Sequence, residues 1–252
     1  SAVRQVVCQN DGNLPWLLLD DVLTPIAEPK AALKLMLALS DALQAEWSKR
    51  GESYVRKTAI LAEEQQRWDI ALETWEWDIR LSDDASAELD LVHMAEICAR
   101  KSGDYAAAIE LCTRYLRQYP SGTQAENMEY LIPWCELNAG RTDEALLHCG
   151  DFIDAHADST LVPNALIVKG MAYSAKRENE NAMRCFDEVL KRYPNHSAVP
   201  KAQLMIGFVH LACRRYDAAK AEFTRFLDLY PDHQDASVAK EYLRKLQEPR
   251  FR

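Results

Sequence analysis

A repeat of 37 residues constrains this chain of 252 residues more than any other feature of its sequence. Shifting the sequence by 37 positions aligns one alanine from each of five units, namely Ala71, Ala108, Ala145, Ala182 and Ala219. The same shift aligns an apolar side chain four residues after each alanine, namely Trp75, Cys112, Cys149, Phe186 and Phe223. A fixed period in this range is typical of stacked supersecondary units, because one unit alone cannot bury its apolar face.

Each unit carries the pattern of two helices. Apolar residues recur at three- and four-residue spacing in both halves of the unit, which indicates amphipathic helices. Polar turns that contain glycine, such as residues 101–104 and 138–141, separate the halves. Three second helices are expected to end at a Tyr–Pro pair, because proline lacks a backbone donor and disfavours helix in the residue before it. The sequence therefore predicts helical hairpins, with the alanine where the paired helices approach most closely.

These positions resemble the tetratricopeptide-repeat family. The last two units carry the glycine, alanine, aromatic and proline of the family pattern, namely Gly170, Ala182, Phe186, Pro194, Gly207, Ala219, Phe223 and Pro231. The last unit departs at His210, where an aromatic residue is usual, and the third has Pro133 in place of the glycine. The resemblance covers about residues 52–231 and is weakest in the first two units, which lack the glycine. It implies an all-α fold, a right-handed α–α superhelix (solenoid) of about five helical hairpins.

Flanking segments are expected to close the two ends of the stack, which would otherwise expose apolar faces. Residues 1–50 fall out of the 37-residue register and are predicted to form an N-terminal helical arm or cap, with a helix over residues 31–47. The repeats themselves occupy residues 51–233. Residues 234–252 are predicted to form a C-terminal capping helix and tail, with the helix over residues 235–247.

Charge and cysteine usage restrict the partners and the compartment. The chain has 30 basic and 39 acidic residues, and a formal charge of −9 argues against general nucleic-acid binding. No apolar run reaches the roughly 20 residues that span a bilayer, so direct membrane insertion is not expected. Seven cysteines without a CxxC pair favour the cytoplasm. The long period and the Tyr–Pro endings instead resemble bacterial envelope members of the family, such as the Tol–Pal-associated periplasmic protein and outer-membrane assembly lipoproteins, so both compartments stay open.

The sequence contains no recognisable catalytic or cofactor motif. Phosphate-binding loops and the HExxH and GxSxG patterns are absent, so we expect no enzyme activity and no cofactor. His148, Cys149 and His156 lie on adjacent turns of one predicted helix, but structural zinc takes about four convergent ligands, and no metal is expected. Cys98 and Cys135 are repeat equivalents, as are Cys112 and Cys149, and both pairs are predicted to be buried free thiols.

The resemblance also implies an interaction surface, because the first helix of each family hairpin lines a concave groove. Carrying the groove positions over repeat by repeat gives a set of candidate partner-binding residues, namely Arg56, His93, Arg100, Tyr130, Trp134, Asn138, Asn164, Met171, Ser174, Lys201 and Phe208. Tyr130, Trp134, Met171 and Phe208 would form an apolar stripe across three repeats. Either the stripe binds a partner or the stack buries it against itself.

Two functions follow from this surface. The first is a non-catalytic protein–protein interaction module that binds a peptide or a partner helix in the concave groove. The alternative is a structural, self-associating scaffold segment of a bacterial cell-envelope assembly. A groove with exposed aromatic residues would favour the first, and a groove filled by residues 1–50 would favour the second.

Overall fold

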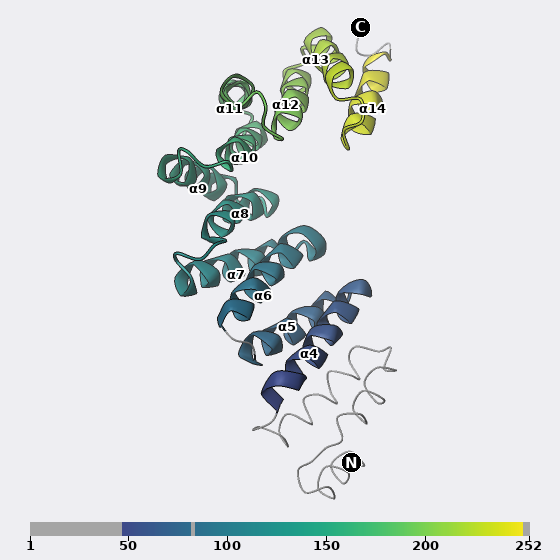
Figure 1. Ribbon diagram of the computed structural model, residues 1–252. Helices are drawn as coiled ribbons and strands as arrows, with labels where there is room; N and C mark the ends of the chain where they lie inside the picture. The colour runs from purple at the N-terminus through teal and green to yellow at the C-terminus, as the bar shows by residue number, and fades with distance from the viewer. Residues whose placement is uncertain (1–46, 82–83, 249–252) are drawn as a thin grey trace, which may run out of the picture. The chain divides into compact units, whose positions relative to one another are not determined.

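A computed structural model describes residues 47–81 and 84–248 (Figure 1). The predicted helix over residues 31–47, and nearly all of the predicted N-terminal arm, lie outside the described residues. The described part is helical throughout, with the following elements: α4 (Trp47–Glu64), α5 (Trp68–Leu81), α6 (Asp84–Ile97), the π-helical η1 (Cys98–Ser102), α7 (Tyr105–Gln118), α8 (Ala125–Asn138), α9 (Thr142–Ala155), α10 (Val162–Ala175), α11 (Asn179–Arg192), α12 (Val199–Ala212), α13 (Tyr216–Leu229) and α14 (Ala236–Leu246).

The helices follow the 37-residue register of the sequence. The second helices α5, α7, α9, α11 and α13 are each 14 residues long, and each begins 37 residues after the one before it. The first helices α8, α10 and α12 keep the same spacing, and α14 begins where a sixth first helix would begin. The predicted all-helical repeat fold and its C-terminal helix are therefore confirmed. The helix α6 departs from the register because it begins early and is extended by η1.

A left-handed residue recurs in every turn from a first helix to a second. The positions with positive φ are also 37 residues apart, namely Gln66, Gly103, Gly140, Arg177 and Arg214. A residue in this region reverses the chain after a helix, and glycine adopts it without a side-chain clash. The period thus extends to the backbone of the turns, although glycine occupies only two of the five.

The chain divides into two compact units. Unit 1 contains α4, α5, α6, η1 and residues 117–122, whereas unit 2 contains residues 105–116 and α8 to α14. Within unit 2, α8 pairs with α9, α10 with α11, and α12 with α13, and α14 packs on α13. Figure 1 places α8, α10, α12 and α14 along the inner side of the curve of unit 2, and α9, α11 and α13 along its outer side.

A glycine faces an aromatic ring in the core of the last two hairpins, α10–α11 and α12–α13. The aligned alanines of the repeat are all fully buried, and so are Phe186 and Phe223. A Cβ built on Gly170 would lie 2.5 Å from the Phe186 ring, and one on Gly207 would lie 2.6 Å from the Phe223 ring. Each glycine is therefore required because an aromatic ring lies against its Cα. The third unit has Pro133 at the glycine position and the smaller Cys149 at the aromatic position, so the two departures offset each other in size.

Cysteine reactivity provides a first test of this core. Cys98, Cys112, Cys135 and Cys149 are free and buried, and burial raises the pKa of Cys98 to about 11 and that of Cys149 to about 12. Because the thiolate is the reactive form, we expect iodoacetamide at pH 8 to label Cys213, which is partly exposed, first among the cysteines that the structure describes and Cys149 slowest. Peptide mapping over time measures this order. A crosslink between Cys98 and Cys135, or rapid native labelling of Cys149, would contradict the packing described here.

Candidate interaction surface

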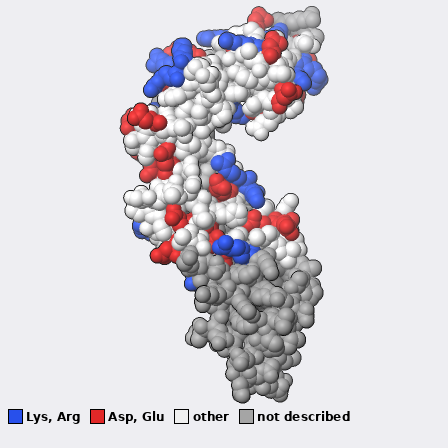
Figure 2. Space-filling model, in the orientation of Figure 1, with Lys and Arg blue, Asp and Glu red and all other residues white. Residues whose placement is uncertain are grey.

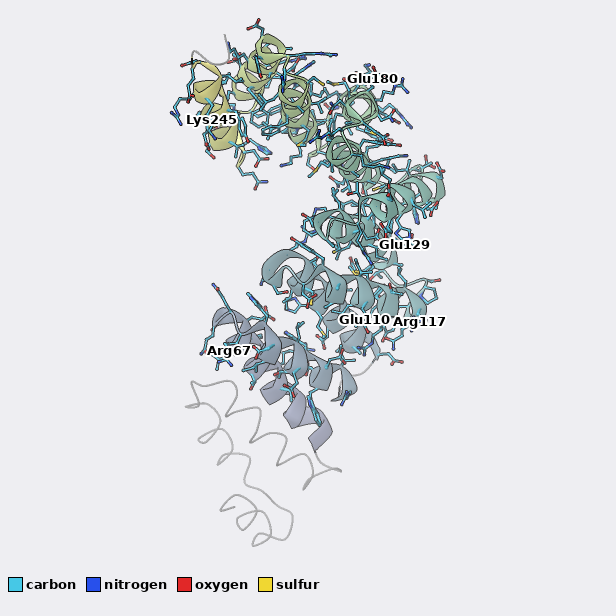
Figure 3. The ribbon with its side chains drawn as sticks, turned by 180° about the vertical axis from the view of Figure 1, so that it is seen from behind. Arg67, Glu110, Arg117, Glu129, Glu180 and Lys245 are labelled. Carbon is cyan, nitrogen blue, oxygen red and sulfur yellow. The ribbon has the colours of Figure 1, made fainter. Side chains whose placement is uncertain are left out.

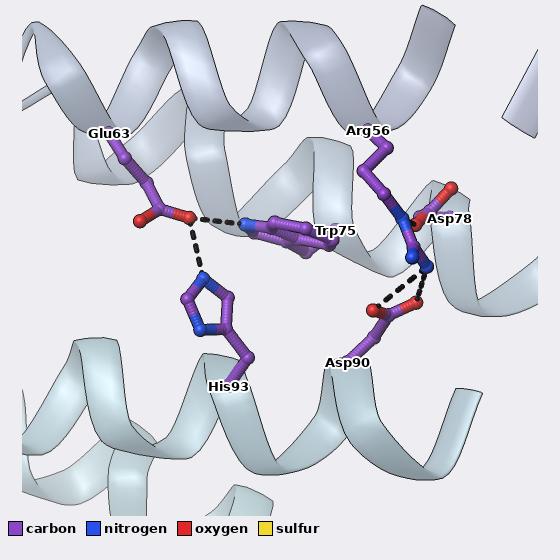
Figure 4. Close-up of polar contacts among 6 residues, drawn as sticks. All are labelled: Arg56, Glu63, Trp75, Asp78, Asp90 and His93. Carbon is purple, nitrogen blue, oxygen red and sulfur yellow. Dashed lines mark hydrogen bonds and ion pairs between the residues drawn. The ribbon is translucent and has the colours of Figure 1, made fainter. Parts of the chain in front are cut away.

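Arg56 connects three helices of unit 1 (Figure 4). Its Nε donates a hydrogen bond to Asp78 Oδ2 on α5 at 2.8 Å, and its Nη2 donates to Asp90 Oδ2 on α6 at 2.9 Å. Both carboxylates are buried, with Asp78 fully enclosed and Asp90 5% exposed. Burial raises the pKa of Asp90 to about 6; the charge of Arg56 opposes this rise, and the neighbouring Asp78 adds to it.

A second set of contacts surrounds Trp75 in the same unit. The indole Nε1 donates to Glu63 Oε1 at 2.7 Å, and the same oxygen lies 2.8 Å from His93 Nε2 (Figure 4). Lys101 of η1 lies 3.5 Å from the other oxygen of Glu63. The guanidinium of Arg56 lies over the indole, with 5.7 Å between Cζ and the ring centroid. Together these contacts connect α4, α5, α6 and η1.

Two of the three sequence-predicted groove residues in unit 1 thus belong to one internal network. Arg56 and His93 hold α4 against α6, although their side chains keep 38% and 41% of their surface exposed. Arg100 is exposed on η1. The partners Asp78 and Asp90 were missed by sequence reasoning, because a single carboxylate between apolar neighbours in an amphipathic helix is usually taken for a surface charge. The only sign of their burial in the sequence was that each lies on a helix face that also carries apolar core residues.

On α8 the predicted residues lie together on one side of the helix. The ring of Trp134 meets Tyr105 of α7 edge-on with centroids 6.0 Å apart, and Tyr130 lies 6.1 Å from Phe152 of α9. Both Tyr130 and Trp134 are partly exposed, whereas Asn138 is exposed and donates to the Trp134 carbonyl at 2.7 Å. This face of α8 therefore presents two partly exposed aromatic side chains, each with its ring against an aromatic ring of a neighbouring helix.

The predicted positions on α10 continue this pattern. Met171 is partly exposed and packs against the same buried cluster as Tyr130. Asn164 and Ser174 are partly exposed at the two ends of α10. Ser174 Oγ is buried and has no hydrogen-bond partner within residues 47–81 and 84–248. Tyr130, Trp134 and Met171 are thus the part of the predicted stripe that lies on neighbouring first helices.

Phe208 and Lys201 on α12 contact the C-terminal helix instead. The Phe208 ring lies edge-on to Phe223 at 5.2 Å and to Tyr242 of α14 at 4.9 Å, between ring centroids. Lys201 Nζ lies 3.2 Å from a carboxylate oxygen of Asp235, the residue before α14. Phe208 therefore helps to attach the capping helix. The sequence predicts the capping helix but not the contact between Tyr242 and Phe208.

Neither a metal centre nor a membrane span is found in the part of the chain that the structure describes. No three His, Cys, Asp or Glu side chains there are grouped as metal ligands would be. Among the same residues, every helix is too short or too polar to cross a bilayer.

The repeating helical hairpins, their shared register and the glycine–aromatic contacts give this chain the fold of a tetratricopeptide-repeat solenoid. Residues 160–248 match the sequence model of the YfiO family, described as an outer membrane lipoprotein. The match covers α10 to α14, the part in which the repeat pattern is most regular. Among curated proteins, none matches the sequence significantly.

Solved structures have the same fold at low sequence identity. The Rap protein complexed with Competence and Sporulation Factor aligns with a TM-score of 0.58 and 14% identity, over 90% of this chain and 64% of that chain. Yeast Tom70 aligns with a TM-score of 0.56 and 14% identity, over 85% of this chain and 43% of Tom70. A thermophilic tetratricopeptide-repeat protein of Thermus thermophilus aligns with a TM-score of 0.54 and 17% identity, over 78% of this chain and all of that chain. The chain thus spans less than two thirds of the length of the first two proteins.

Proposed function

We propose that this chain is a non-catalytic protein–protein interaction module that binds a peptide or a partner helix along the first helices of unit 2. One observation carries the proposal: Tyr130, Trp134 and Met171 are partly exposed on α8 and α10, which lie side by side on the inner side of unit 2 (Figure 1). Aromatic residues and methionine are enriched at protein interfaces, where their area is buried at little entropic cost. Asn138 and Asn164 would supply polar contacts at the margins, whereas the Ser174 hydroxyl is buried.

The fold comparison supports a binding role of this kind. The Rap protein was solved in complex with Competence and Sporulation Factor, so one protein of the same fold forms a specific complex. The fold alone does not identify the partner of this chain, because tetratricopeptide-type helical hairpins can present many different surface residues. The partner is therefore defined only as a polypeptide that brings apolar side chains to α8 and α10.

A structural role in a cell-envelope assembly is the second candidate. The match of residues 160–248 to an outer membrane lipoprotein family supports an envelope location. End-to-end stacking at the C-terminal end is disfavoured by α14, because Lys240, Glu241 and Arg244 give its outer face a charged surface. Self-association would then have to use another face of the chain.

Substitutions at the inner face distinguish binding from packing. We expect Trp134→Ala and Met171→Ala to weaken binding of a captured partner by about 2 kcal/mol each, or roughly 30-fold in Kd. Calorimetric titration with the purified partner measures the loss, and a thermal melt of each variant measures stability. Leu147→Ala is the matched control, because Leu147 is an apolar side chain 60% exposed on the outer helix α9.

The dissociation constant and the melting temperature distinguish a binding surface from a packed core. A binding surface predicts a weakened Kd with a melting temperature close to that of the parent protein. If Trp134→Ala lowers the melting temperature and leaves Kd unchanged, the stripe is part of the core and the proposal is wrong. Phe208→Ala is unsuitable for this test, because its contacts with α14 predict a loss of stability as well.

A further inference from the structure

A pocket of about 350 Å³ opens between α7, α8 and α9 in unit 2. Its walls come from the second helices α7 and α9 and from the side of α8 that carries Glu129 and Glu136, away from the stripe on α8 and α10. Ile109, Ile132 and Phe152 provide apolar surface on three sides. The pocket is therefore separate from the interaction surface proposed above.

Three carboxylates line the same pocket. Glu136 is 3% exposed, and its two oxygens lie 3.5 Å from Arg141 and 2.7 Å from His148 Nδ1. Glu129 Oε2 lies 2.5 Å from His156 Nε2. These contacts account for the two histidines that stood out in the sequence, since each pairs with a glutamate of α8.

Asp151 is the remaining carboxylate. It is exposed on α9, and no hydrogen bond or ion pair joins it to any other described residue. An apolar pocket with an uncompensated carboxylate at its edge matches a side chain that has a methylene stem and a cationic end.

The hairpin around the pocket is strongly acidic. Residues 123–158 contain eight acidic side chains and one basic side chain, a formal charge of −7, compared with −9 for the whole chain. Figure 2 shows acidic side chains gathered over α9 and basic ones over neighbouring α11, and Figure 3 labels Glu110 and Glu129 on the adjacent helices α7 and α8. A concentrated charge of one sign raises the local concentration of oppositely charged groups.

We infer that this pocket binds the basic side chain of a partner polypeptide, an arginine or a lysine. The methylene stem lies along Ile109, Ile132 and Phe152, and the cationic end reaches the carboxylates of Asp151 and Glu129. A guanidinium suits the site best, because its planar donors bind a carboxylate in pairs. The inference is independent of the groove proposal, since the pocket and the stripe use different faces of α8.

Amide chemical shifts test the inference with a defined probe. The probe is a capped pentapeptide, Ala-Ala-Arg-Ala-Ala, and its control carries citrulline, which is nearly isosteric with arginine but neutral. We expect the arginine peptide to shift the amides of Ile109, Ile132 and Phe152 in a saturable way, and the citrulline peptide to bind at least tenfold more weakly. A lysine peptide shows whether an ammonium group suffices. No saturable shift up to about 10 mM arginine peptide would overturn the inference.

Two matched variants separate the pocket from a general acidic field. Asp151→Asn removes one charge at the pocket, and Glu144→Gln removes one charge from an exposed position of the same helix that does not line it. We expect the Kd of the arginine peptide to rise three- to tenfold in Asp151→Asn and less than twofold in Glu144→Gln. Equal effects, or equal binding of the citrulline peptide, would mean that no cation-specific pocket exists. Both sites are exposed, so circular dichroism should report unchanged helicity.

Discussion

Replacing Phe186 with alanine should lower the free energy of unfolding of unit 2 by about 3–5 kcal/mol, the usual loss for a fully buried phenylalanine. The ring has no exposed surface and belongs to a buried cluster formed by α9 to α12. It also fills the space beside Gly170, where an added Cβ would lie 2.5 Å from the ring. Ala182 and Val189 of the same cluster are themselves fully buried, so we expect little relaxation around the cavity. Urea denaturation monitored by circular dichroism measures the loss.

Gly170→Ala tests the same contact from the opposite side. The new methyl group overlaps the Phe186 ring, and overpacking of this kind typically costs about 1–3 kcal/mol. Gly150→Ala is a matched control, because a Cβ there would meet only Lys169 Nζ at 3.9 Å. In a Phe186→Leu background the penalty of Gly170→Ala should shrink, because the smaller side chain leaves room. Equal penalties in both backgrounds would contradict a direct glycine–ring contact.

The repeat register was predictable from sequence because it depends on residue size at fixed positions. Local steric requirements determine three features of the repeat: the aligned alanines, the glycines that face Phe186 and Phe223, and the Tyr–Pro pairs. Because these features recur at the same repeat positions, they locate the second helices and the C-terminal helix. The extension of α6 by η1 was not predictable in this way. No single residue type specifies a π-helical turn, and α6 begins ahead of the register although Gly103 and α7 keep it.

The interaction surface was predictable only in part. A repeat position indicates which helix carries a residue but not what its side chain contacts. Trp134 and Met171 are partly exposed at the positions that the repeat pattern predicts. Arg56 instead pairs with Asp78 and Asp90. Phe208 packs against Tyr242 of the C-terminal helix. Such contacts join residues from different helices, with sequence separations as large as 34 between Arg56 and Asp90. The sequence pattern likewise could not predict the pocket between α7, α8 and α9, because its lining comes from three different helices.

Removing the charge of Arg56 should produce the largest effect on unit 1. Arg56→Met keeps much of the apolar stem but leaves the buried carboxylates of Asp78 and Asp90 without their cation. Breaking such a buried pair commonly costs about 3–5 kcal/mol, and we expect about 3 kcal/mol near pH 7.5, because the arginine side chain is 38% exposed. Hydrogen–deuterium exchange of peptides from α5 and α6 measures the local loss. Arg67→Met is the control, since its pairing with the exposed Asp69 at 3.8 Å should contribute less than about 1 kcal/mol.

The pH dependence of the same unit follows from Asp90. Burial raises its pKa from 3.8 to about 6, so the folded state keeps this proton at pH values where the unfolded state has released it. The stabilisation from a neutral Asp90 is fully present below pH 3.8 and is lost as the pH rises through about 6. Asp90→Asn keeps the position neutral at every pH. The variant should therefore match the parent protein near pH 4 and exceed its stability by roughly 2–3 kcal/mol at pH 7.5.

The double variant Arg56→Met/Asp90→Asn tests whether the loss of stability without Arg56 depends on the charge of Asp90. Arg56 is the only described cation that offsets the charge of Asp90. Without it, Asp90 should be neutral over a wider pH range. The loss of stability caused by Arg56→Met should therefore become smaller as the pH is lowered to 5. Adding Asp90→Asn to Arg56→Met should likewise restore most of the stability at pH 7.5, because the buried carboxylate of Asp90 is then absent. If the cost of Arg56→Met stays the same from pH 5 to pH 8 and Asp90→Asn does not relieve it, the loss comes from the contact of the Arg56 guanidinium with the Trp75 ring, and the ion pairs do not stabilise unit 1.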